Sequence, residues 1–120
     1  SMSLKLGFGF TKHSERVGFH MRHLQEKIVD INRAVNADLL LMDARKCLIT
    51  GGPFHGEVRQ PNIIMASGDR IAMDVEGIKT IESFEGADLK DDPWSYRQIR
   101  HAVELGLGAR NEQEYRVVAA

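Results

Sequence analysis

The stretch that decides the fold is Asp38-Leu-Leu-Leu-Met-Asp43. Four consecutive apolar residues between two aspartates predict a short strand that is covered on both faces. A second run of the same kind, Asn62-Ile-Ile-Met-Ala-Ser67, predicts another buried strand. The connection over residues 44–61 is rich in turn residues and has no helical period, so the two strands need not be parallel. We therefore expect a small sheet that is mixed or parallel.

About three amphipathic helices are expected to cover this sheet, which makes the fold α/β. The predicted helices are residues 20–35, residues 70–84 with Asp69 as N-cap, and residues 93–105, which Asp92-Pro93 opens and Gly106 closes. The other predicted segments are a strand-like entry over residues 3–10, a loop over residues 11–19, a short strand over residues 47–50 and a last strand over residues 115–119. We treat residues 1–120 as a single domain and expect it to be a fragment of a larger one.

Length and charge exclude several classes of protein. The chain has 120 residues and a formal net charge of -1, which gives no bulk attraction to nucleic acid or to an anionic membrane. No apolar run approaches the roughly 20 residues that span a bilayer. The single cysteine, Cys47, cannot form an internal disulfide, which suits a reducing compartment. We expect a cytoplasmic protein with no nucleic-acid or membrane partner.

Three aspartates are candidate ligands. Asp74 falls on the apolar side of its predicted helix, where a carboxylate must be paired, hydrogen-bonded or bound to a metal. Asp69 is explained by its N-cap role, yet the same place after a strand also binds anions and ligands in α/β proteins. Asp43 ends a buried strand and is either a ligand or the first residue of a turn.

The histidines allow a metal site without requiring one. His20 and His23 are three residues apart, so on a helix they lie near one face, a spacing that can serve zinc. The alternative is that both are surface or partly packed residues. His55 lies in the glycine-rich loop over residues 51–56, from which it can reach a ligand. That loop lacks the Gly-Lys-Ser/Thr ending of a phosphate-binding loop, and one cysteine excludes a self-contained iron–sulfur cluster.

Several segments, in this order, resemble the C-terminal half of the DUF362 family, a prokaryotic domain of unknown function. The resembling segments are Ser3-Leu4-Lys5, residues 24–35, residues 38–44, Gly51-Gly52-Pro53 with Gly56, residues 68–74 and residues 99–108. Leu6 stands where the family has asparagine, and Arg70-Ile71 stands where it has Pro-Val. Some members carry a ferredoxin-like module, so the resemblance implies two partners: that module and the missing N-terminal half.

Two functions follow from these observations. The first is the ligand- or metal-binding half of an enzyme whose reaction is unknown. Its contributors would be Lys5, His55, Asp69 and Asp74 for a ligand, and His20, His23 and Asp43 for a divalent metal. The second is a non-catalytic module that docks against a ferredoxin-like or other redox partner. A pocket that collects the carboxylates would favour the enzyme, and a bare apolar patch would favour docking. A fragment should also form a homodimer through residues 3–10 or the edge beside them.

Overall fold

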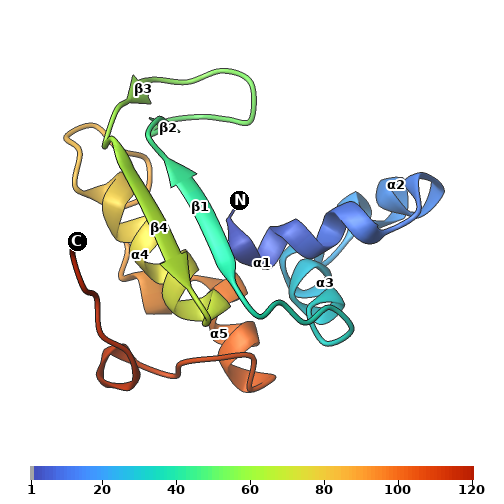
Figure 1. The fold of residues 1–120 in the computed structure, drawn as a ribbon. Coiled ribbons are helices and arrows are strands. Elements are labelled where there is room, and N and C mark those ends of the chain that lie inside the picture. Colours follow the sequence, from blue (N-terminus) through green and yellow to red (C-terminus); the bar gives the residue numbers. More distant parts are fainter. Residues whose placement is uncertain (1) are drawn as a thin grey trace.

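The structure is a computed structural model that describes residues 2–120, except the side chains of Val17, His20 and Met21. Its helices are α1 (Ser3–Leu6), α2 (His13–Met21), α3 (Leu24–Ile31), α4 (Arg70–Glu82) and α5 (Arg97–Glu104), with the short 3-10 helices η1 (Gly7–Phe10), η2 (Pro93–Ser95) and η3 (Glu112–Glu114). Its strands are β1 (Leu40–Ala44), β2 (Cys47–Leu48), β3 (Val58–Arg59) and β4 (Ile63–Ser67). Figure 1 shows their arrangement.

The strands form two small antiparallel sheets. In the first, β1 pairs with β4, so that Leu40 lies opposite Ser67 and Ala44 lies opposite Ile63. In the second, β2 pairs with β3. The mixed α/β fold is confirmed, and the alternative of a parallel sheet is wrong. A parallel pair needs a long crossover, usually helical, and the connection between β1 and β4 contains only the small β2–β3 sheet.

Helix α4 is the centre of the molecule. It covers one face of the β1–β4 sheet, α1 and α5 pack against it, and α3 packs against α1 and α5 (Figure 1). The helix begins where the sequence predicts, because the Asp69 carboxylate accepts hydrogen bonds from the N–H groups of Ile71 and Ala72, each at 2.8 Å. The core residues come from these four helices: Leu4, Val29, Ile71, Val75, Ile78, Ile99 and Ala102.

The N-terminus differs from the prediction, because residues 3–10 are helical. The N–H of Ser3 donates to the buried carboxylate of Asp74 at 2.6 Å, and the N–H of Leu4 donates to the same group at 3.3 Å. Asp74 therefore caps α1 from another helix. A cap supplied from so far along the chain leaves no local pattern, which is why the alternation of leucine and phenylalanine suggested a strand.

The next segment is also more helical than predicted. Residues 11–19 were expected to form a loop, but most of them belong to α2. The predicted helix over residues 20–35 is interrupted at His23, whose φ of 55° is left-handed, and α3 begins after it. A left-handed residue cannot continue an α-helix, so one expected helix becomes the end of α2 and the whole of α3.

The C-terminal third follows the prediction only in part. The expected helix over residues 93–105 is divided into η2 and α5. Gly106 ends α5 as expected, with a φ of 68° and its N–H on the Val103 carbonyl at 2.9 Å. Residues 115–119 were expected to form a strand. They are extended, but no strand of the described chain pairs with them.

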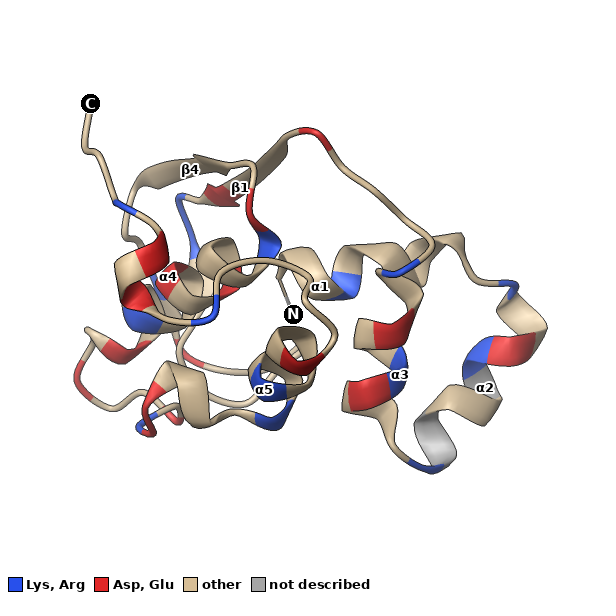
Figure 2. Ribbon diagram, turned by 90° about the horizontal axis from the view of Figure 1, so that it is seen from below, with Lys and Arg blue, Asp and Glu red and all other residues tan. Residues whose placement is uncertain are grey.

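None of the described helices combines the length and the apolar character that crossing a bilayer requires. Charged residues of both signs are interleaved along α3 and α4, whereas β1 and β4 are mostly uncharged (Figure 2).

Candidate functional site

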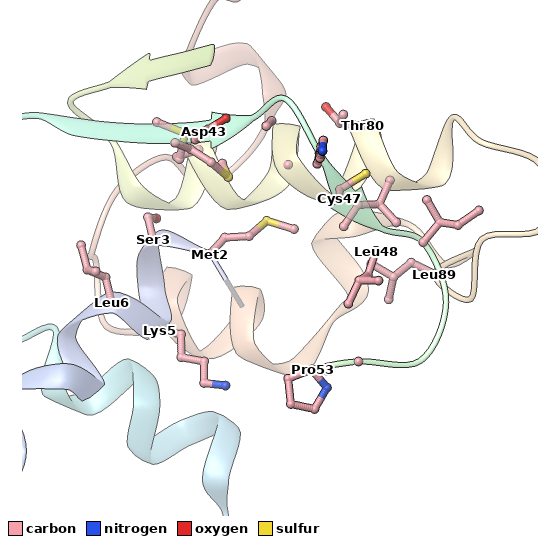
Figure 3. A pocket seen from close by; sticks show the side chains of 18 of the residues that line it. Met2, Ser3, Lys5, Leu6, Asp43, Cys47, Leu48, Pro53, Thr80 and Leu89 are labelled. Atoms are coloured by element: carbon pink, nitrogen blue, oxygen red, sulfur yellow. The ribbon is translucent and has the colours of Figure 1, made fainter. Parts of the chain in front are cut away.

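A groove of about 930 Å³ lies beside β1, on the side away from β4. Besides β1, Asp88 and Leu89, three parts of the chain supply most of the side chains of its wall (Figure 3). These are the N-terminal segment with Met2, Ser3, Lys5 and Leu6, the loop that follows β1 over residues 46–53, and α4 with Met73, Gly77, Thr80 and Ile81. The groove thus lies where the first residues of the chain approach the central helix and the sheet.

The groove runs along the edge of β1. Residues 39–44 all line it without a gap. Successive side chains of a strand point to opposite faces, so a groove on one face would touch only every second residue. An unbroken run means that the groove lies against the edge, where the backbone N–H and C=O groups point. Within the described chain no strand pairs with β1 on this side, so these groups are available to another segment.

The outer face of the same sheet, turned away from α4, is apolar and bare. Leu41 lies opposite Ala66 and next to Ile64, and the two larger side chains are 72% and 64% exposed. Leu39 and Leu6, 68% and 66% exposed, extend this surface to the groove. The prediction of a strand covered on both faces is therefore wrong for the described residues, because α4 covers only one.

Asp43 lies on this outer face and also lines the groove. The Arg45 guanidinium donates to both of its carboxylate oxygens, at 3.0 Å and 2.7 Å, and the Arg45 N–H donates at 3.0 Å. The hydrogen bonds from Arg45 lower the pKa of Asp43 to about 2. Asp43 is therefore a turn residue held as a carboxylate, and its side chain stays 56% exposed.

The Asp69 carboxylate is fully used by backbone donors. One oxygen caps α4, and the other accepts the N–H of Ala109 at 2.6 Å. Asp69 therefore ties the segment after α5 to the start of α4. The approach is close, because a Cβ on Gly108 would lie 2.4 Å from an Asp69 oxygen.

Asp74 is buried as predicted, with 3% of its surface exposed. Its carboxylate accepts the N–H groups of Ser3 and Leu4 and contacts the Ser3 hydroxyl at 2.5 Å. Burial raises the pKa of Asp74, although the hydrogen bonds from Ser3 and Leu4 act in the opposite direction. These contacts give Asp74 a structural role as the cap of α1.

The predicted site residues do not form one cluster. His55 is exposed in its loop, and His23 is 64% exposed with its ring 3.7 Å from Glu26. The side chain of His20 lies outside the described residues. Across the described part of the chain, no three histidine, cysteine, aspartate or glutamate side chains are grouped so as to hold a metal. The structure does bring Lys5 and Asp43 to one groove.

A family model for a Domain of unknown function (DUF362) matches residues 1–79. The chain belongs to the DUF362 family. No curated protein matches it, and no solved structure does. In this DUF362 chain the match runs from α1 into α4, and so includes β1, β4 and most of the groove. The resemblance noted at residues 99–108 lies outside the matched residues.

The sequence analysis missed the apolar surface of Leu6, Leu39, Leu41 and Ile64. Its signal was present, since two continuous apolar runs in one sheet require a cover on each face, and one central helix supplies only one. It also missed the role of Arg70. This buried guanidinium donates to the carbonyls at residues 32 and 35, at 3.1 Å and 2.8 Å, and so holds the end of α3 on α4.

Proposed function

We propose that this DUF362 chain is a docking module that binds an extended segment of a protein partner along the free edge of β1. The observation that carries the proposal is the groove of about 930 Å³ that lies against this edge, next to a bare apolar face. A segment in the groove would hydrogen-bond to the backbone of β1 and extend the sheet to three strands.

The stability of small sheets supports the proposal. A two-stranded sheet is marginally stable unless a third strand or a packed helix supports it, and an open edge attracts other chains. Here α4 supports one face only. A third strand would lie over Met73 and Ile81 of α4, which line the groove, and would border Leu41 on the outer face. The partner segment should therefore have apolar side chains on both of its faces.

A synthetic peptide of six valines and threonines, ordered so that valines lie on both faces of an extended strand and with a lysine at each end for solubility, tests this proposal on the full chain. We expect saturable binding in isothermal titration calorimetry and slower hydrogen exchange of the β1 amides. Leu41→Asp should weaken binding about tenfold through lost apolar contact. The matched control is Phe10→Asp, at a side chain that is 75% exposed and lies outside the groove lining, and it should bind as the parent does. No binding by a monomeric chain, or equal binding by both variants, contradicts the docking function.

The ligand- or metal-binding half of an enzyme is the second candidate, because Lys5 and Asp43 line the same groove. The lysine would hold an anionic group of a substrate, and the carboxylate would take part in holding a divalent cation. Thermal denaturation with magnesium, manganese or zinc tests this candidate. A rise in melting temperature that Asp43→Asn abolishes would support it, and an unchanged melting temperature with all three metals would count against it.

The partners that the family resemblance implies fit the docking function. An N-terminal half of the same protein or a ferredoxin-like module can each supply an extended segment to the β1 edge. We propose the cytoplasm as the location of such a complex. For a homodimer through residues 3–10, the available side chains are Leu6 and Phe10, because Leu4 is buried in the core of its own chain.

A further inference from the structure

Residues 115–120 form a strand-like segment that has no sheet. Tyr115 has extended backbone angles, φ -142° and ψ 167°. The valines that follow, Val117 and Val118, are 63% and 72% exposed. Valine and tyrosine favour strands, and the sequence of this segment predicts one. Among the described residues, β1 therefore has an edge with no strand beside it, and residues 115–120 form a strand-like segment that pairs with no strand.

The segment is anchored away from the groove. The Tyr115 hydroxyl donates to Glu76 at 2.7 Å, and Lys79 contacts the same carboxylate at 2.9 Å. At about 100° per residue, Lys79 lies on a different side of α4 from Met73, Gly77 and Ile81, which line the groove, and Glu76 lies between the two sides. Figures 1 and 2 agree, since in both views the C-terminus lies on the β4 side of the sheet and α1 lies on its β1 side.

The segment cannot reach the groove of its own molecule and still pair there. Residues 116–120 extend over about 17 Å at most. Pairing with β1, a strand of five residues, would use that whole length. Because Tyr115 is bound to α4 directly before Arg116, no link remains between the anchor and residues 116–120 that could cross α4, and we expect these residues to pair with another molecule.

One antiparallel register matches the two strands on both faces. It places Arg116 opposite Asp43 and Val118 opposite Leu41 on the outer face. On the inner face it places Val117 opposite Met42. A parallel pairing that keeps Arg116 beside Asp43 would instead put Val118 beside Arg45. Charge and apolar character together therefore select the antiparallel register.

We propose that the segment docked on β1 is residues 116–120 of a second copy of this chain, and that two copies exchange these segments reciprocally. The inference rests on the proposed docking function and names its partner. Each exchange covers part of the bare face with Val118 and pairs Asp43 with the partner's Arg116. The exchange is isologous, as expected of a two-fold dimer.

Size-exclusion chromatography with light scattering tests this on the full chain across the micromolar range. We expect the mass of two chains. Arg116→Asp should raise the dimer dissociation constant roughly tenfold or more, because two symmetric attractive pairs become repulsive. Asp43→Arg should do the same, and the double variant with both changes should restore the dimer. Arg100→Asp, an equal change of charge at an exposed position of α5, is the control and should remain a dimer.

A mass of one chain at every concentration overturns the exchange, and so does a dimer that Arg116→Asp leaves intact. Binding of the valine–threonine peptide distinguishes failure of the exchange from failure of the docking function. If the chain is a monomer and binds the peptide, only the second copy is ruled out as the partner. If the chain is a monomer and does not bind the peptide, the docking function is ruled out as well.

Discussion

Replacing Asp74 by alanine should lower the free energy of unfolding by roughly 2–5 kcal/mol, because two backbone donors, one partly and one fully buried, lose their acceptor. These donors are the N–H groups of Ser3 and Leu4, and Leu4 is fully buried. Each buried donor without a partner costs about 1–3 kcal/mol, and relaxation or entry of water reduces the sum. Against a typical total of about 5–15 kcal/mol, this loss is large.

Urea denaturation in metal-free buffer measures the effect. Asp74→Asn keeps an acceptor oxygen for the two N–H groups, so it should cost about 1 kcal/mol or less. Asp38→Ala, at an exposed aspartate, is the control and should change stability by less than about 0.5 kcal/mol. A ligand carboxylate would behave differently, since its removal from a metal-free protein relieves a burial cost. An alanine variant as stable as the parent would therefore refute the capping role.

The pH dependence gives a second test of Asp74. The Ser3 hydroxyl lies 2.5 Å from Asp74 and 2.9 Å from the Arg70 carbonyl, yet it has one hydrogen to donate. A protonated Asp74 satisfies both contacts, because it donates to Ser3 while Ser3 donates to Arg70. This agrees with the raised pKa of Asp74, whose main cause is burial. The parent should therefore lose stability relative to Asp74→Asn as pH rises from the ordinary carboxyl value of 3.8 through the raised pKa.

Two further predictions concern contacts between elements. Asp69→Ala should cost roughly 2–3 kcal/mol, since it removes the N-cap of α4 and the acceptor for Ala109; a loss near 1 kcal/mol in urea denaturation would mean that only the cap matters. His101 lies 2.9 Å from Asp30, and this hydrogen bond raises the His101 pKa above 6.5. The stability that it adds should be fully present below pH 6.5 and lost as pH rises through the raised pKa, and Asp30→Asn should reduce this dependence in melting curves recorded across that range, since Glu104 also raises the His101 pKa.

Local patterns predicted the elements whose causes are local. Asp69 caps the helix that it precedes, Gly106 ends the helix that it follows, and the two apolar runs form β1 and β4. The prediction for residues 3–10 failed because their helix depends on Asp74, which lies 71 positions from Ser3 along the chain. The break before α3 was not predicted because it depends on the left-handed backbone of His23, which the helical period of the sequence does not indicate.

The local role of each candidate residue could be predicted from the sequence, but whether these residues lie close together could not. The burial of Asp74, the cap at Asp69 and the turn at Asp43 each follow from position in a strand or helix, and the structure contains all three. Whether such groups converge depends on their tertiary partners. Asp69 accepts a hydrogen bond from Ala109, 40 residues further along the chain, and Asp43 accepts hydrogen bonds from Arg45. Each carboxylate is satisfied separately, so the three do not gather around a ligand.

The continuous apolar runs have to be explained by something beyond α4. A sheet with one solvated face alternates apolar and polar residues, and an exposed Leu41 between Leu40 and Met42 breaks that rule. Burying a leucine or isoleucine side chain contributes about 1.5–3 kcal/mol, so covering the two-thirds of Leu39, Leu41 and Ile64 that are exposed would contribute roughly 3–6 kcal/mol. That gain is comparable to the stability of many small domains. The sequence of β1 and β4 is therefore suited to a covered state, and a strand added beside β1 supplies part of that cover together with the hydrogen bonds that its edge lacks.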